Sequence, residues 1–288
     1  MLSTTISVLI DATLLTFTLA LASLGLAIIF GLIGVINMGH GAMLTLGAYF
    51  TWWTMEAGFP FAAAAIIAAT CVAIIGLALE HFIIRHFYDK PFETLLITWG
   101  FFLVTTEVIK IAFGTDIHNI PNPLPGSFDL GVQQVPAYRM LLAIITLGLF
   151  LAIGFVFYRT TIGIKVRALT QNREMASLLG LDIGRTYKLV FVTGSFLAGL
   201  AGALICPMLS IDPYIGMVFL VRAFFVVIVG GIGQILGGTL IGSFLIGGSE
   251  TLFALFSTQT FAQTVVFALA IIVLRFRPLG VLTSATRT

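Results

Sequence analysis

The sequence has 288 residues, of which 59% are hydrophobic and only 9% are charged, with a formal net charge of +2. Soluble domains carry about 25% charged residues, so this composition excludes an ordinary water-soluble globule. The small net charge gives no reason to expect a nucleic-acid partner. We therefore predict an all-α integral membrane protein that forms a single transmembrane domain over residues 1–288.

Nine apolar segments follow one another along the chain and predict membrane helices. A helix that crosses the bilayer needs about 20 mostly apolar residues, and the second, seventh and ninth segments are shorter than this. We expect eight to nine transmembrane helices, because a short segment can be broken or re-entrant. The continuous apolar runs lack the alternation of a β-barrel. The segments are Val8–Gly34, Gly41–Met55, Pro60–Ile84, Glu93–Phe113, Tyr138–Tyr158, Tyr187–Leu209, Met217–Val229, Ile235–Phe256 and Phe261–Leu274.

Two glycine-rich apolar stretches, Phe30–Trp53 and Val226–Gly248, lie in the two halves of the chain. Paired segments of this kind are typical of transporters with inverted repeats, in which broken helices line a central cavity. We therefore predict a pseudo-symmetric inverted-repeat core. Close packing of helices through small residues is the alternative explanation for each glycine.

Asn37 and His40 are polar residues within the first of these stretches, and such residues usually face the protein interior or a water-filled cavity. The alternatives are an interhelical hydrogen bond for Asn37 and a solvated position in a cytoplasmic turn for His40. Thr98 and Tyr49 lie in spans where they can line a cavity for an aliphatic side chain. The candidate residues of a substrate pathway are Asn37, His40, Gly41, Tyr49, Thr98, Gly231 and Gly233.

Two polar segments interrupt the apolar runs. Residues 114–137 contain four prolines and no lysine or arginine, whereas residues 159–186 contain five lysine and arginine side chains. Because lysine and arginine accumulate in cytoplasmic loops, we predict that residues 159–186 are cytoplasmic and that residues 114–137 form a periplasmic loop. This orientation places the N-terminus outside and the C-terminus in the cytoplasm.

The cytoplasmic segment predicts a short amphipathic helix, Ile164–Leu179. Thr160 or Thr161 can cap its start, and Gly180 stands where a glycine commonly ends a helix. The helix can rest on lipid headgroups or dock into a groove on a partner protein. Small alanines flanked by charge favour the protein contact. The side chains expected on one face are Ile164, Ala168, Met175 and Leu179.

Several chemistries have no support in the sequence. There is no GxxxxGK[ST] motif, so the chain is not predicted to hydrolyse ATP itself, and clustered catalytic residues are lacking. The two cysteines suggest neither a disulfide framework nor a metal site, and we expect no cofactor. Glu107 is expected to pair with Lys110. Glu250 is expected to meet Arg222 or to contact a second chain.

Three stretches resemble one known family. They are RALTQNREMASLLGLDIGRTYKLVFVTGSFLAGLAGAL, the N-x-x-H-G followed by G-A-Y that begins at Asn37, and VVIVGGIGQILGGTLIG. Together they are similar, in order and over nearly the whole chain, to the permeases of ABC importers for branched-chain amino acids, the Liv type. Leu181 stands where other members often have isoleucine or valine, which is a minor departure.

The resemblance implies a multi-pass permease subunit in the bacterial inner membrane, surrounded by membrane lipid. Its implied partners are a second homologous permease subunit, two ATP-binding cassette ATPase subunits and a periplasmic substrate-binding protein. The cytoplasmic helix would be the coupling element that responds to closure of the ATPases. The residues assigned to ATPase coupling are Lys165, Arg167, Ala168, Asn172, Ala176 and Gly180.

The resemblance also implies the substrate class, which is branched-chain or other small amino acids. The alternatives are urea, short amides or other small polar organic molecules, and, in a different class, a secondary transporter or channel without an ATPase. If Ala176 lies on a docking face, the substitution Ala176→Arg is expected to leave folding intact and to uncouple transport from ATP hydrolysis.

Overall fold

The computed structural model describes residues 2–129, 131–256, 258–277 and 280–282. Within them the protein is almost entirely helical, and each predicted span corresponds to one helix. These helices are α1 (Leu2–Ile33), α2 (His40–Glu56), α3 (Phe61–Phe82), α4 (Pro91–Phe113), α5 (Ala137–Arg159), α8 (Ile183–Ile205), α9 (Ile215–Gly230), α10 (Ile235–Ala254) and α11 (Gln259–Phe276).

Six of these helices are long and apolar enough to cross a membrane, namely α1, α3, α4, α5, α8 and α10. The remaining three, α2, α9 and α11, are the segments that the sequence marks as short. The all-α membrane fold is therefore confirmed. The three segments that are short in the sequence are also short helices in the structure.

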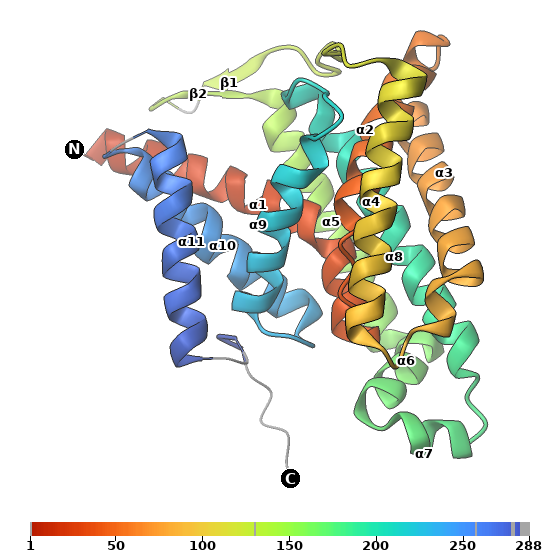
Figure 1. The fold of residues 1–288 in the computed structure, drawn as a ribbon. Helices are drawn as coiled ribbons and strands as arrows, with labels where there is room; N and C mark the ends of the chain where they lie inside the picture. Colours follow the sequence, from red (N-terminus) through yellow and green to blue (C-terminus); the bar gives the residue numbers. More distant parts are fainter. Residues whose placement is uncertain (1, 130, 257, 278–279, 283–288) are drawn as a thin grey trace.

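Short elements connect and decorate these helices. The chain between α5 and α8 contains α6 (Thr161–Gln171) and α7 (Arg173–Leu178). Two 3₁₀ turns, η1 (Ile84–His86) and η2 (Cys206–Met208), follow α3 and α8. Strands β1 (Ser127–Asp129) and β2 (Gln134–Pro136) form an antiparallel hairpin. In Figure 1 the hairpin lies at one end of the molecule and α6 and α7 lie at the opposite end, as expected for loops on opposite sides of a membrane.

The core is built around α1 and α8, which pack against each other. Helix α3 packs on α8, and in the same way α10 packs on α1. The short helices show the same relation. Helix α2 contacts α3 and α8, and helix α9 contacts α10 and α1. The helices α1, α2 and α3 are thus matched by α8, α9 and α10. This arrangement is the pseudo-symmetric core that the sequence predicts.

The two glycine-rich stretches are not equivalent within this symmetry. Phe30–Trp53 covers the end of α1, a non-helical segment and most of α2, whereas Val226–Gly248 covers the end of α9, a turn and α10. The segment that matches the one before α2 is Leu209–Tyr214, which precedes α9. Glycine marks close helix packing as well as helix breaks, so its density alone does not identify equivalent elements.

The predicted cytoplasmic helix Ile164–Leu179 is wrong as a single element. The backbone of Asn172 is extended, and its side-chain oxygen accepts a hydrogen bond from the Met175 N–H at 2.9 Å, so this residue ends α6 and caps α7. Thr160 caps α6 by accepting a hydrogen bond from the Gly163 N–H, as expected. Gly180 has a φ of +83° directly after α7, which fits its predicted place at the helix end.

Close backbone contact between helices yields a first prediction. A Cβ on Gly47 of α2 would collide with the carbonyl oxygen of Gly199 on α8, and backbone atoms cannot move aside cheaply. Gly47→Ala should therefore destabilise the protein by about 1–3 kcal/mol and lower its melting temperature in detergent by several degrees.

Gly148→Ala is the matched control, because a Cβ on this glycine of α5 would meet no atom within 4 Å. Alanine stabilises a helix relative to glycine, so this variant should melt at the wild-type temperature or slightly above it. Equal melting temperatures for the two variants would contradict the packing described here.

Candidate functional site

Helix α2 begins in the interior of the molecule. His40, its first residue, is fully buried and its Nε2 lies 2.7 Å from the carbonyl oxygen of Ala22. Ala22 lies eleven residues before Ile33, the end of α1. At 1.5 Å per residue this is about 16 Å from that end, or about half of a 30 Å hydrocarbon layer. The alternative of a solvated position in a cytoplasmic turn for His40 is therefore wrong.

The segment 34–39 returns from the end of α1 to this interior position along α4. Thr98 of α4 holds it, because its hydroxyl accepts a hydrogen bond from the Met38 N–H at 3.1 Å and lies 3.3 Å from the Ile36 carbonyl oxygen. A Cβ on Gly39 would collide with the ring of Phe101. We call this arrangement, made of segment 34–39, His40 and Thr98, the α2 break.

The α2 break contains polar atoms without partners. Neither atom of the Asn37 side-chain amide has a hydrogen-bond partner among the described residues, and the same is true of Nδ1 of His40. Both side chains are fully buried. A buried polar group left unpaired costs about 1–3 kcal/mol, so such groups in a folded protein call for a water molecule or a ligand.

Helix α9 begins beside the α2 break. The Gly216 N–H donates to the hydroxyl of Thr45 at 3.1 Å, and a Cβ on Gly41 would lie 2.9 Å from the Gly216 carbonyl oxygen. Two helix N-termini therefore meet in the interior, where each carries a partial positive charge. This local field favours a negatively charged or electron-rich group.

Tyr49 lies two turns beyond the α2 break, within an aromatic cluster. Its ring is 5.4 Å from that of Phe113 and 6.0 Å from that of His118, and His118 stacks on Trp52 at 3.8 Å. Antiparallel backbone hydrogen bonds between His118 and Ile211 hold this part of the outer loop in place. No local pattern in the sequence indicates that His118 joins Tyr49.

The seven pathway candidates separate into three places. Asn37, His40, Gly41 and Thr98 meet at the α2 break, and Tyr49 lies farther along α2. Gly231 and Gly233 form the turn between α9 and α10, with φ angles of +117° and +89°. This turn packs against residues 280–282, so these two glycines do not join the others.

The coupling candidates lie together on α6 and α7 but point in different directions. Arg167 donates to the carbonyl oxygen of Phe157 and lies over its ring, which fixes α6 against the end of α5. Ala176 is only 2% exposed, so it faces the chain itself rather than a partner. Ala168 is half-buried, whereas Lys165, Asn172 and Gly180 are exposed.

Three exposed apolar side chains lie on α7 and its C-cap. Leu178 and Leu179 are 82% and 83% exposed, and Met175 is more than half exposed. We call these three residues the α7 apolar face. The expected role of Ala176 on an outward docking face is thus corrected, because the break at Asn172 turns the small residue inward and leaves the larger apolar residues outside.

Arg173 ties α7 to the loop between α3 and α4. Its guanidinium pairs with Asp89 and lies over the ring of Tyr187, 5.5 Å from the centroid. In the same loop the Tyr88 hydroxyl donates to the buried carboxylate of Glu80 at 2.7 Å. Burial, followed by this hydrogen bond, raises the pKa of Tyr88 well above its usual range, so the phenol stays a donor at physiological pH.

A cavity of about 470 Å³ lies apart from the α2 break, between the first half of α1 and α9. It contains charges of both signs, supplied by Asp11, Arg139, Asp212 and Arg222. Arg139 and Asp11 were not identified from the sequence, because each is a single charge at the edge of an apolar run and only the fold brings them together.

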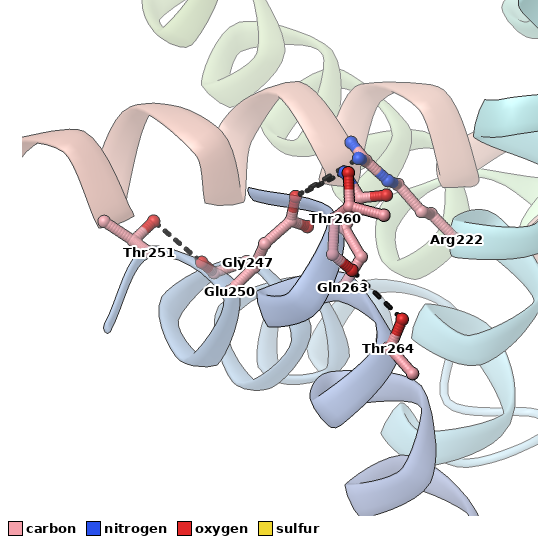
Figure 2. A network of polar contacts seen from close by, with 7 residues as sticks. All are labelled: Arg222, Gly247, Glu250, Thr251, Thr260, Gln263 and Thr264. Atoms are coloured by element: carbon pink, nitrogen blue, oxygen red, sulfur yellow. Dashed lines mark hydrogen bonds and ion pairs between the residues drawn. The ribbon is translucent and has the colours of Figure 1, made fainter. Parts of the chain in front are cut away.

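The buried ion pair at this cavity confirms one of the two expectations for Glu250. Arg222 of α9 donates to the Glu250 carboxylate of α10 at 3.1 Å, and the Gln263 amide of α11 donates to the same oxygen at 3.2 Å. Figure 2 shows these side chains converging from three helices. The expected pair of Lys110 with Glu107 is also present, at 2.6 Å.

The α2 break yields a second prediction. Thr98→Val removes the acceptor of the half-buried Met38 N–H and leaves this donor unpaired, which should destabilise the protein by about 1–3 kcal/mol. Hydrogen exchange of residues 34–39 should become faster.

Thr106→Val is the control, because the Thr106 hydroxyl donates only to the Phe102 carbonyl oxygen of its own helix. Its effect on segment 34–39 should be small. If both valine variants left exchange in this segment unchanged, Thr98 would not hold the α2 break.

Comparisons with known proteins place the chain in a family. Residues 8–274 match the family described as "Branched-chain amino acid transport system / permease component". The chain is 28% identical to the "High-affinity branched-chain amino acid transport system permease protein LivH" of Escherichia coli (strain K12), over 92% of this chain and 91% of the relative. It is 27% identical to the corresponding permease BraD of Pseudomonas aeruginosa, with the same coverage.

The similarity also extends beyond amino-acid permeases. The chain is 27% identical to the ribose import permease RbsC of Haemophilus influenzae, over 62% of this chain and 56% of the relative. No solved structure matches the chain. The chain belongs to the permease component family of branched-chain amino acid transport systems.

Proposed function

We propose that this chain is the membrane-spanning subunit of an ATP-driven importer that moves branched-chain or other small amino acids. In this proposal it works with a second homologous permease subunit, two ATP-binding cassette ATPase subunits and a periplasmic binding protein that delivers the substrate. The match of residues 8–274 to the permease family carries the proposal. The relatives named above as amino-acid permeases, which the chain matches over 92% of its length, support the substrate class.

The α2 break is the proposed part of the substrate pathway. Asn37, His40, Gly41 and Thr98 meet where two helices begin inside the molecule, and unpaired polar atoms there are available to a solute or to water. Tyr49 extends the pathway toward the hairpin end. Broken helices near the middle of a membrane serve this purpose in many transporters.

The α7 apolar face is the proposed contact with an ATPase subunit. Three large apolar side chains on a six-residue helix and its C-cap are costly to leave in water, and a groove on a partner can bury them. Lys165, Asn172 and Gly180 are exposed on the same segment and can join this contact. Arg167 and Ala176 instead hold α6 and α7 on the rest of the chain.

Contacts lead from α7 toward the α2 break. Arg173 pairs with Asp89 in the loop that precedes α4, and Thr98 of α4 binds segment 34–39. We infer that a shift of α7 reaches the pathway through α4.

Reconstitution of the chain with the permease and ATPases encoded beside its gene tests the proposed function. The expected result is co-purification of two ATPases and ATP-dependent uptake of L-leucine from a supplied binding protein. Uptake by the chain alone, or uptake that needs no ATP, would overturn the proposal.

The α7 apolar face yields a third prediction. Leu178→Arg should leave the melting temperature unchanged, since the side chain is exposed, but should lower ATP-driven uptake about tenfold or more by blocking a close contact. Leu178→Met, which keeps an apolar side chain of similar size, should retain uptake. Normal uptake by the arginine variant would exclude this face as the coupling contact.

Ala176 yields a fourth prediction, which replaces the one made from the sequence. Because Ala176 is buried against the chain, an arginine there overpacks the site and should destabilise the fold by about 3 kcal/mol. Thermal melting of purified Ala176→Arg measures this. A wild-type melting temperature would show that the residue has free space around it.

A further inference from the structure

Glu80 is a buried carboxylate near the end of α3. Its side chain is 1% exposed, and one of its oxygens accepts a hydrogen bond from the Tyr88 hydroxyl at 2.7 Å. The other oxygen has no hydrogen-bond partner among the described residues. A carboxylate that is removed from water is costly unless it is hydrogen-bonded. The bond from Tyr88 is therefore the contact that holds this group in place.

Tyr88 belongs to the short loop between α3 and α4, residues 83–90. The loop is fixed at two points, because Ile84 is fully buried in the core and Tyr88 is bound to Glu80. Between these points the Phe87 N–H donates to the Ile84 carbonyl oxygen and closes a turn. The loop is thus a folded element, and the position of its second half depends on the bond between Tyr88 and Glu80.

The second half of this loop contacts α7. Asp89, which follows Tyr88 directly, pairs with Arg173 at the start of α7. The rings of Tyr88 and Tyr187 meet edge to face with their centroids 5.0 Å apart, and the Arg173 guanidinium lies over the Tyr187 ring. Figure 1 shows α7 at the end of the molecule where α3 ends and α4 begins. Asp89 and Tyr187 therefore hold α7, and Tyr88 lies beside both.

The bonds on the two sides of Asp89 differ in strength. The side chains of Arg173 and Asp89 are 40% and 78% exposed, and an exposed ion pair contributes little to stability. The bond from Tyr88 ends instead on a buried carboxylate, where loss of a hydrogen-bond partner is costly. The position of Asp89 relative to α7 therefore depends more on Glu80, through Tyr88, than on the ion pair itself.

Close contacts lead from Glu80 to α2. Gly76 lies one turn before Glu80 on the same face of α3, and a Cβ on Gly76 would collide with the side chain of Ser195 on α8. One turn beyond Ser195, the carbonyl oxygen of Gly199 lies where a Cβ on Gly47 of α2 would be. Helices packed this closely transmit a displacement to one another. A shift at Glu80 can thus reach the helix that begins at the α2 break.

We propose that Glu80 is a positioning residue for coupling. Through Tyr88 it sets the place of Asp89, so that a movement of α7 passes into α3 and onward through α8 to α2. This route is additional to the one through α4. The proposal rests on the proposed function, because it assigns a residue to the transfer of work from the ATPase subunits to the pathway of the same importer.

The amount of leucine transported per ATP hydrolysed tests this role. Both rates are measured on the complete importer in the same proteoliposomes, so their ratio does not depend on how much of the complex folds. Tyr88→Phe removes only the hydroxyl and should lower the ratio about tenfold while ATP hydrolysis continues. Glu80→Leu, which removes the acceptor, should do the same. Glu80→Gln keeps an oxygen that can accept the bond and should stay within about twofold of the wild type.

Tyr158→Phe is the matched control, because it also removes one hydroxyl, but from an exposed side chain at the end of α5. It should keep the wild-type ratio. Asp89→Asn should lower the ratio, since it weakens the pair with Arg173. If Tyr88 acts through Asp89, the double variant with Tyr88→Phe and Asp89→Asn should be no worse than the more damaging single change.

The outcomes separate this proposal from the proposed function. A wild-type ratio in Tyr88→Phe or Glu80→Leu would overturn the role of Glu80 and leave the importer proposal standing. Losses that multiply in the double variant would also overturn it, because independent defects add in free energy. An equal loss in Tyr158→Phe would do so as well. Absence of ATP-dependent leucine uptake by the unmodified importer would overturn the proposed function itself.

Discussion

Direct contact between helix backbones is the constraint on which this structure depends. Lipid is as apolar as a leucine side chain, so the hydrophobic effect does little to hold membrane helices together and close packing must do so. Here α2 lies against α8 where Gly47 meets Gly199, and α2 meets α9 where Gly41 faces Gly216. Only residues without a Cβ allow these approaches, and they let two short helices begin inside the molecule.

At the beginnings of α2 and α9, non-helical backbone with polar N–H and C=O groups lies inside the molecule. Contact of these groups with lipid would be unfavourable. Non-helical backbone is stable within a membrane only where protein or water covers it. Segment 34–39 meets this condition through Thr98, and the segment before α9 meets it through its pairing with His118. The side-chain amide of Asn37 is a polar group in this region that has no hydrogen-bond partner among the described residues.

The apolar runs of the sequence locate every membrane helix, because burial in lipid requires about 20 apolar residues whatever the fold. They carry no information on depth, so they could not show that His40 lies beside Ala22. The same limit applies to α7. The amphipathic spacing predicts helical structure here. The direction of α7, however, depends on the cap at Asn172, and in this direction Ala176 faces inward.

The charged residues of the cavity between α1 and α9 could not be predicted for a different reason. Asp11, Arg139, Asp212 and Arg222 come from four separate elements, and each taken alone is a single charge near an apolar run. Only the packing of these segments around one cavity brings them together. Of this set, Arg222 was predicted to meet Glu250, since a buried charge needs a partner and few other charges were near.

The Arg222–Glu250 pair links the stability of the fold to its chemistry. A buried ion pair adds little net stability compared with apolar packing, because taking two charges out of water is costly. The pair instead fixes how three helices meet, because Glu250 of α10 accepts hydrogen bonds from Arg222 of α9 and from Gln263 of α11 on the same oxygen. Glu250 holds the cation in place, and Arg222 also lines the cavity between α1 and α9.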